Sequence, residues 1–290
     1  MKSKIYYRNV LVNGIRIFYR EAGDTNAPGI VLFHGFPSSS HMFRDLIPIL
    51  AKQYHVIAPD YPGFGNSEIP DRKEFSYTFD HISQVMEAFL IEVNMLRFAM
   101  YVFDYGAPIG FRIAKKNPDW INAIISQNGN VYQEGLGIKW SERAKYWKNP
   151  TEELREKYKS AFNPDTIINQ YLNGTSKGTV SPDGYTLDIA YMSRAGMDEI
   201  QSDLIFDYQN NVNQYAEYQQ YLKKYQPPVL CVWGKNDVSF IPEGAYAYKT
   251  DVPKAEIHLL DSGHFALESH TDEIGELIFK FLQKQQQGEK

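Results

Sequence analysis

Three polar residues that could carry out covalent hydrolysis stand at the ends of strand-like apolar runs. Asp104 follows FAMYVF, Asp237 closes VWGKND, and His264 lies in LLDSGHF. In open parallel sheets the carboxyl ends of the strands form the binding edge, so residues at such ends can converge. A carboxylate that attacks, a histidine that activates water and a second carboxylate that orients the histidine together make a covalent catalytic set.

Asp104 stands where a sharp strand–turn–helix motif usually carries a serine. The usual pattern G-x-S-x-G reads Val102-Phe103-Asp104-Tyr105-Gly106 here. Aspartate is also common as a helix cap, which is the alternative interpretation of Asp104. The chain order of nucleophile, acid and histidine is the order typical of folds with this motif, and it favours the catalytic interpretation.

A carboxylate in this position predicts chemistry at a saturated carbon. Aspartate is ionised at neutral pH, with an ordinary pKa near 3.9, so it can attack without losing a proton first. It would open an epoxide or expel a halide and leave an ester on Asp104, which water activated by His264 would hydrolyse. We expect the backbone N–H groups of Phe36 and Tyr105 to stabilise the oxyanion of the second step. Asp237 would orient His264.

The elements that must position these residues follow an alternating pattern. Asn13-Gly14 between two alternating apolar runs predicts a β-hairpin. Helix-period segments then separate short buried-type strands, which we expect at residues 29–34, 54–59, 98–103, 121–126, 227–233 and 255–260. We expect helices over 42–53, 79–93 and 109–117 between them. The pattern predicts an α/β fold with a mostly parallel sheet flanked by helices.

One long segment interrupts the alternation. Residues 132–228 contain helical patterns and turn clusters but no clear buried strand, and they hold 11 of the 21 tyrosines. The strand pattern resumes after this segment, which argues against a separate trailing domain. We therefore predict a core of residues 1–131 and 229–290 with an inserted helical cap, or lid, of residues 132–228.

Composition excludes several functional classes. The net charge is −5 without a basic block, so we expect neither nucleic acid nor an anionic membrane surface as a partner. The start of the sequence has no apolar stretch typical of a signal peptide, and no window approaches a membrane span, so we expect a cytoplasmic protein. Cys231 is the only cysteine and is expected in the core. The seven histidines are scattered and no metal-binding motif occurs, so we expect no metal and no cofactor.

Five short motifs, taken in order, resemble a known family. HGFP, DYPGFGNS, the D-x-G of the turn at Asp104, GKND and GHF are similar to α/β-hydrolases, and specifically to the branch with an aspartate nucleophile. That branch contains the epoxide hydrolases and the haloalkane and haloacid dehalogenases. The resemblance covers residues 30–130 and 229–270. It implies the α/β-hydrolase fold, a cis Phe36–Pro37 peptide, a small apolar organic substrate and water as the other reactant.

The resemblance favours an epoxide over a halide. In epoxide hydrolases two lid tyrosines protonate the leaving alkoxide, and Tyr208 in FDYQNNV and Tyr132 in NVYQEG are the first candidates, with Tyr191 and Tyr185 in reserve. Regular spacing of lid tyrosines also suits a packing stripe. The loop HGFP, without the asparagine of many haloalkane dehalogenases, points the same way. Arg residues directly after the nucleophile, which hold the substrate carboxylate in fluoroacetate dehalogenases, are absent.

Other interpretations stay open. A haloalkane or haloacid dehalogenase is second, with Trp140 and Trp147 as the nearest candidates for halide donors. An esterase is third, because a carboxylate is a poor nucleophile toward an ordinary ester. A binding protein of the same fold with little turnover is the last. His34 and Asp60 are expected to support the loops around the site, and the protein could be a monomer or a homodimer.

Overall fold

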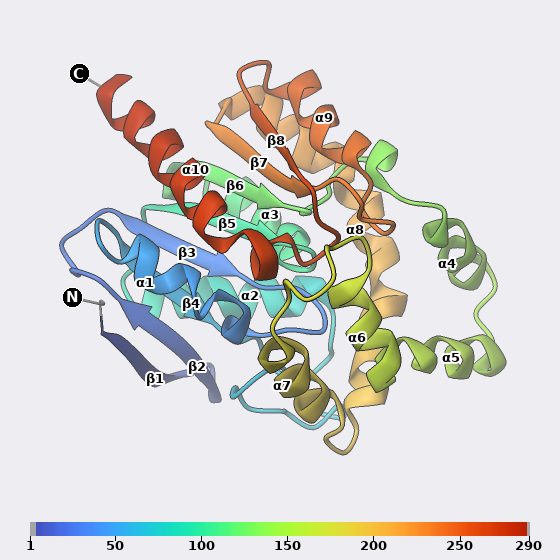
Figure 1. Cartoon of the computed structure of the whole chain (residues 1–290). Coiled ribbons are helices and arrows are strands. Elements are labelled where there is room, and N and C mark those ends of the chain that lie inside the picture. The colour runs from blue at the N-terminus through green and yellow to red at the C-terminus, as the bar shows by residue number, and fades with distance from the viewer. Residues whose placement is uncertain (1–3, 289–290) are drawn as a thin grey trace.

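The fold is built on one mixed sheet, seen in a computed structural model that describes residues 4–288 (Figure 1). The eight strands lie in the order β1-β2-β4-β3-β5-β6-β7-β8, with β1 and β2 antiparallel to their neighbours and the other pairs parallel. The strands are β1 (Ile5–Val12), β2 (Ile15–Ala22), β3 (Gly29–Phe33), β4 (His55–Pro59), β5 (Phe98–Phe103), β6 (Ile121–Gln127), β7 (Val229–Gly234) and β8 (Glu256–Leu260). The predicted hairpin and the six predicted strands are confirmed within two residues.

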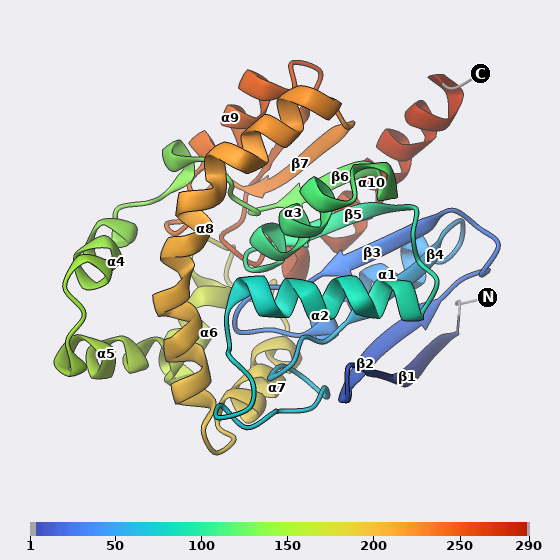
Figure 2. The same ribbon diagram turned by 180° about the vertical axis from the view of Figure 1, so that it is seen from behind.

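Helices cover both faces of the sheet. α1 and α10 lie together on the face toward the viewer in Figure 1, and α2 and α3 lie on the opposite face in Figure 2. Their bounds, with α9, are Leu46–Leu50 (α1), Phe79–Glu92 (α2), Gly106–Lys116 (α3), Pro242–Asp251 (α9) and Ala266–Gly288 (α10). The single helix predicted over 42–53 is wrong, because a 3₁₀ turn at Ser40–Phe43 precedes a short α1. Pro48 lacks a backbone N–H, so the helix cannot extend a full turn before it.

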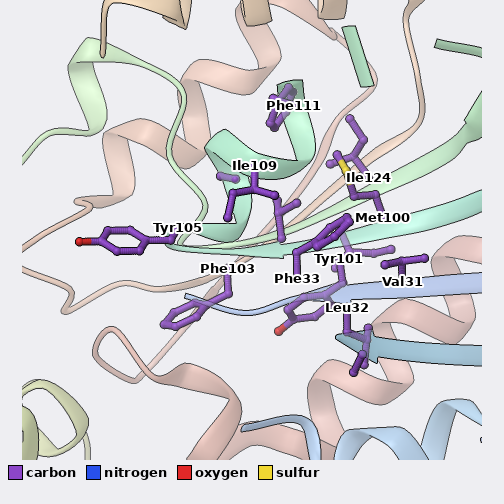
Figure 3. Close-up of a cluster of buried hydrophobic side chains, with 14 of the residues drawn as sticks. Val31, Leu32, Phe33, Met100, Tyr101, Phe103, Tyr105, Ile109, Phe111 and Ile124 are labelled. Carbon is purple, nitrogen blue, oxygen red and sulfur yellow. The ribbon is translucent and has the colours of Figure 1, made fainter. Parts of the chain in front are cut away.

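The sheet centre is buried on both faces. Every residue of β3, β4, β5 and β7 is buried, which explains why these strands read as uninterrupted apolar runs. Figure 3 shows Val31, Leu32 and Phe33 of β3 beside Met100 and Tyr101 of β5. This packing fixes the end of β5, where Phe103 and Tyr105 project in different directions on either side of position 104 in the sequence.

A helical insertion separates β6 from β7. We refer to residues 128–228 as the insertion. It contains no strand and five α-helices, all within the described part of the chain: Lys139–Lys148 (α4), Glu152–Lys159 (α5), Pro164–Leu172 (α6), Pro182–Met192 (α7) and Met197–Tyr225 (α8). The expected inserted helical segment is therefore present, while its limits at 132 and 228 as a folding unit stay a prediction.

Arg112 ties the long helix α8 to the core. Its guanidinium donates to Asn211 Oδ1 at 2.7 Å and to the Tyr218 hydroxyl at 2.6 Å, and it also pairs with Asp80 of α2. Lys115 adds a hydrogen bond to Gln214 Oε1 at 2.8 Å. The second half of α8 is thereby fixed against α2 and α3.

Residues 4–288 lack two features that would indicate other functional classes. No helix there combines the length and apolar character needed to cross a membrane. The same residues contain no group of three or more histidine, cysteine, aspartate and glutamate side chains placed to hold a metal ion.

Candidate active site

Asp104 occupies the turn between β5 and α3 in a left-handed backbone conformation, with φ of 46°. Two glycines make room for this turn. A Cβ at Gly35 would lie 2.4 Å from the Cβ of Asp104, and a Cβ at Gly106 would lie 2.3 Å from the carbonyl oxygen of Phe33. The small residues therefore allow the turn to lie close to the β3 loop, as the strand–turn–helix pattern requires.

The structure brings Asp104, Asp237 and His264 together. His264 Nδ1 lies 2.7 Å from Asp237 Oδ2, within hydrogen-bond distance. His264 Nε2 lies 3.6 Å from Asp104 Oδ2, which is too long for a hydrogen bond and makes the contact electrostatic. All three side chains are buried. The imidazole therefore stands between the two carboxylates, with one ring nitrogen directed at each.

The carboxylate of Asp104 is desolvated but held by the backbone. Burial raises its pKa above the ordinary value, and the charge of His264 and the N–H groups of Phe36 and Tyr105 oppose that rise. The Phe36 N–H donates to Asp104 Oδ1 at 2.8 Å. One oxygen is thus oriented by a backbone donor while the other faces the imidazole.

The electrostatics of His264 are set by its two neighbours. Burial by itself lowers the pKa of His264, but the adjacent Asp237 carboxylate, and then Asp104, outweigh burial and raise it above the ordinary value. Asp237 is itself held, because its Oδ1 accepts the Ser239 N–H at 2.7 Å. A fixed acceptor on Nδ1 leaves Nε2 as the nitrogen able to exchange protons in the site.

Asn128, which no sequence motif singled out, also holds Asp237. Asn128 Nδ2 donates to Asp237 Oδ2 at 2.8 Å, and its Oδ1 accepts the Gly234 N–H at 2.9 Å. The residue is fully buried and has φ of 44°. The available signal was the polar run QNGN directly after a predicted strand, at the same edge as the other site residues.

The loop after β3 is supported as expected. The Phe36–Pro37 peptide is cis. The His34 ring stacks on Tyr61 at 4.0 Å between centroids, and the Tyr61 hydroxyl donates to the His34 carbonyl at 2.8 Å. Burial lowers the pKa of His34 to about 3, so the ring is neutral. Asp60 accepts the Ser40 N–H at 2.7 Å, which joins this loop to the one after β4.

A cavity of about 370 Å³ opens above these groups. Its floor includes Asp104 and His264, and its walls come mainly from the insertion. Much of the insertion's contribution is polar, with Lys139, Glu142, Arg143, Tyr158, Asn169 and Gln170 among the lining residues. The lining is therefore less apolar than a small apolar substrate would lead one to expect. Larger surface depressions of about 820 and 800 Å³ do not include the three site residues.

The tyrosines expected to act are placed differently from one another. Tyr208 is fully buried against Tyr105, with ring centroids 5.9 Å apart, and it does not line the cavity. Tyr132 lies elsewhere, because its hydroxyl donates to Asp251 Oδ2 at 2.8 Å and the residue does not line the cavity. The reserve residues Tyr185 and Tyr191 do not line it either.

Two further aromatic features bear on the chemistry. Tyr158, which the sequence did not single out, lines the cavity. The indole N–H of Trp140 donates to the Ser239 carbonyl at 3.0 Å, and that of Trp147 donates to the Ile205 carbonyl at 3.1 Å. Both indole donors are therefore occupied by the backbone.

Comparison with known proteins places this architecture in a family. Residues 28–271 match the model of the α/β hydrolase fold. An uncharacterized hydrolase of Saccharomyces cerevisiae is 44% identical over 282 residues, covering 96% of this chain and 97% of the relative. A haloalkane dehalogenase of Psychrobacter cryohalolentis is 25% identical over 92% of this chain and 88% of its own. The crystal structure of an epoxide hydrolase from Vigna radiata superposes with a TM-score of 0.75 at 22% identity, over 97% of this chain and 98% of that one. The chain belongs to the α/β-hydrolase family.

Proposed function

We propose that this hydrolase acts at a saturated carbon through a covalent ester on Asp104, and that its substrate is an epoxide. One observation carries the proposal. In the cavity floor, a buried carboxylate has one oxygen on a backbone N–H at 2.8 Å and the other 3.6 Å from the Nε2 of a histidine held by a second carboxylate.

The first step forms the ester. An oxygen of Asp104 attacks an epoxide carbon, the ring C–O bond breaks, and the resulting alkoxide takes a proton from a tyrosine hydroxyl. No proton has to leave Asp104, so His264 is not needed as a base in this step. Burial of Asp104 removes part of the solvation that would weaken its attack.

The second step releases the product. His264 Nε2 takes a proton from water, and the resulting hydroxide attacks the acyl carbon of the Asp104 ester. The negative oxygen that develops is stabilised by the Phe36 and Tyr105 N–H groups. The bond between the acyl carbon and the substrate oxygen then breaks, and the proton of the added hydroxyl passes to the leaving oxygen, which frees the diol and restores the Asp104 carboxylate. The histidine proton returns to the tyrosinate through solvent. Asp237 stabilises the charged imidazole while it carries that proton.

The choice of an epoxide rests on the available donors. An alkoxide needs a proton, which a tyrosine supplies, whereas a halide needs only N–H or weak contacts. Burial, then Tyr215 and Asp104, raise the pKa of Tyr208 well above the ordinary value, so this hydroxyl stays protonated. Tyr158 lines the cavity. We assign Tyr158 as the first proton donor because it lines the cavity. Tyr208, which does not line the cavity but packs on Tyr105, is the second, and Tyr132 is not carried forward.

A haloalkane is the second candidate, because relatives of this chain include a haloalkane dehalogenase. The occupied indole donors of Trp140 and Trp147 argue against it. Parallel assays of diol formation and halide release on the same preparation separate the two reactions.

Isotope labelling tests the shared mechanism. One turnover in ¹⁸O water should place the label in the Asp104 carboxylate, because water attacks the enzyme's own acyl carbon. Mass spectrometry of the Asp104 peptide detects it, with Asp104→Asn as the control that forms no ester. Label that appears only in the product after a single turnover excludes the covalent route.

Phenylalanine variants test the donors. Tyr208→Phe and Tyr158→Phe should slow ester formation from an epoxide and leave ester formation from an alkyl halide nearly unchanged, because only the alkoxide needs a proton. Rapid-quench measurement of the ester gives both rates. Equal slowing with both substrates would contradict the assignment of a proton donor.

A further inference from the structure

Arg143 of α4 is a cation without an acidic partner in the cavity above Asp104. It is half-buried, and it lines the same cavity as Asp104 and His264. Its Cζ lies 4.4 Å from the centroid of the Trp140 ring, which covers one face of the guanidinium. Among the described residues no carboxylate forms a salt bridge with it and no acceptor takes its side-chain N–H groups. Its nitrogens are not sealed from solvent.

Other charged residues of the insertion, unlike Arg143, do have partners of opposite charge. Arg155 on α5 pairs with Glu199 at 2.6 Å and with Asp203 at 2.9 Å. Glu142, the acid next to Arg143 in the chain, pairs instead with Lys145 at 2.5 Å. The donors of Arg143 therefore remain available to a molecule in the cavity.

The position of Arg143 is close enough to the site to matter electrostatically. Burial raises the pKa of Asp104, and the charge of Arg143 is the smallest of the effects that oppose this rise; it also opposes the rise that Asp237 and Asp104 cause in the pKa of His264. Lys139 and Lys157, which also line the cavity, are exposed. The walls thus offer three positive charges and one acid, Glu142, which is paired with Lys145, opposite a floor that holds the Asp104 and Asp237 carboxylates.

We propose that Arg143 binds a carboxylate group of the substrate, so that the protein acts on an epoxy acid with an electrophilic carbon near a carboxylate. This inference rests on the proposed function for the identity of the reaction. Arginine presents a planar fork that matches a carboxylate, and packing on Trp140 fixes the plane of that fork. Without a cation in the cavity, the Asp104 charge would repel such a substrate.

A rival role for Arg143 is to tune Asp104 without touching the substrate. The two roles differ in one measurable respect. Tuning of the nucleophile changes the reaction of every substrate by the same factor, whereas carboxylate binding changes only the reaction of substrates that carry a carboxylate. A matched pair of substrates therefore separates the two roles.

The kinetic test compares 3-phenyloxirane-2-carboxylate with its primary amide. Arg143→Met should lower kcat/KM for the carboxylate by about 10- to 100-fold, the range for loss of hydrogen bonds to a charged group, and change that for the amide by less than about threefold. Arg143→Lys keeps the charge without the fork and should give an intermediate loss. Lys148→Met is the matched control, since it removes one positive charge from an exposed position of α4 that does not line the cavity. Equal losses for both substrates would overturn the inference.

A binding test keeps the inference separate from the reaction. An unreactive analogue, 3-phenylpropanoate, should raise the thermal midpoint of the wild-type protein and of Lys148→Met but not that of Arg143→Met, while its amide should act equally on all three. Protection that depends on Arg143 without an Asp104 ester from any epoxide would support carboxylate binding and refute the proposed function. Protection that is independent of Arg143 would refute the inference and leave the ester mechanism standing.

Discussion

Replacing Asn128 with alanine should slow hydrolysis of the Asp104 ester while leaving its formation nearly unchanged. Asn128 makes no hydrogen bond to Asp104 and does not line the cavity, but it donates to Asp237 Oδ2 at 2.8 Å, the same oxygen that faces His264 Nδ1 at 2.7 Å. Only the second chemical step uses the imidazole as a base. A defect in the support of Asp237 should therefore appear in that step alone.

The expected size follows from the hydrogen bonds around Asp237. A hydrogen bond to a charged group contributes roughly 1.5–3 kcal/mol. Asp237 would keep the Ser239 N–H at 2.7 Å and the His264 ring, so the lower part of that range applies. About 1.5–2 kcal/mol corresponds to a 10- to 30-fold slower hydrolysis. Alanine at φ of 44° also costs about 1–2 kcal/mol of stability, which reduces folded protein but not the ratio of the two steps.

Rapid-quench kinetics with detection of the ester by mass gives both rate constants in one experiment. Asn130→Ala is the matched control, because Asn130 is an equally buried amide two residues away that donates to the Tyr132 carbonyl at 2.8 Å and makes no hydrogen bond to Asp237. The control should leave the ratio of the two rates as in the wild type. If Asn128→Ala slowed both steps equally, or neither, the assignment of Asn128 as a positioning residue would be refuted.

His264→Gln should form the Asp104 ester once and fail to hydrolyse it, so intact mass after incubation with an epoxide should show one adduct per chain. Esterification removes the negative charge of Asp104, one of the groups that raise the pKa of His264. The hydrolysis step should therefore reach its high-pH plateau at a lower pH than the titration of His264 in the free enzyme followed by NMR. Burial of Asp188 on α7 raises its pKa to about 7, above the ordinary value, so the folded state holds a proton that the unfolded state releases. Stability should accordingly fall as pH rises from about 4 to about 7, and Asp188→Asn should remove that fall in urea unfolding at a series of pH values.

The core strands were predictable because a strand buried on both faces appears in the sequence as an uninterrupted run of apolar residues. β3, β5 and β7 are runs of apolar residues closed by glycine, proline or polar residues, and no helix-period alternative suits them. The short α1 was not predictable from periodicity alone, since its apolar spacing continues through the 3₁₀ turn before it. There the competing effect was the missing N–H of Pro48.

The site residues on the core were also predictable from the sequence, whereas those on the insertion were not. Asp104, Asp237 and His264 were recognisable because each follows a strand whose place in the sheet is set by the alternating pattern. The insertion has no strand pattern that would fix where its residues lie relative to the sheet. Tyr132 was selected by its position in the chain, yet its hydroxyl reaches Asp251 on α9. Arg143 and Tyr158 reach the cavity through the packing of α4 and α5 around α8, which no local pattern encodes.

Because Arg112 anchors α8 to the core, the two sides of the cavity should tolerate substitution to different degrees. α4 and α5 pack on α8 and lie on its outer side, away from the sheet (Figures 1 and 2). The nucleophile, the histidine and its supporting carboxylate all come from loops of the rigid sheet. Substitutions in α4 and α5 can therefore change which substrates the cavity accepts without altering the catalytic residues. We expect closely related proteins to differ in substrate specificity mainly through these two helices.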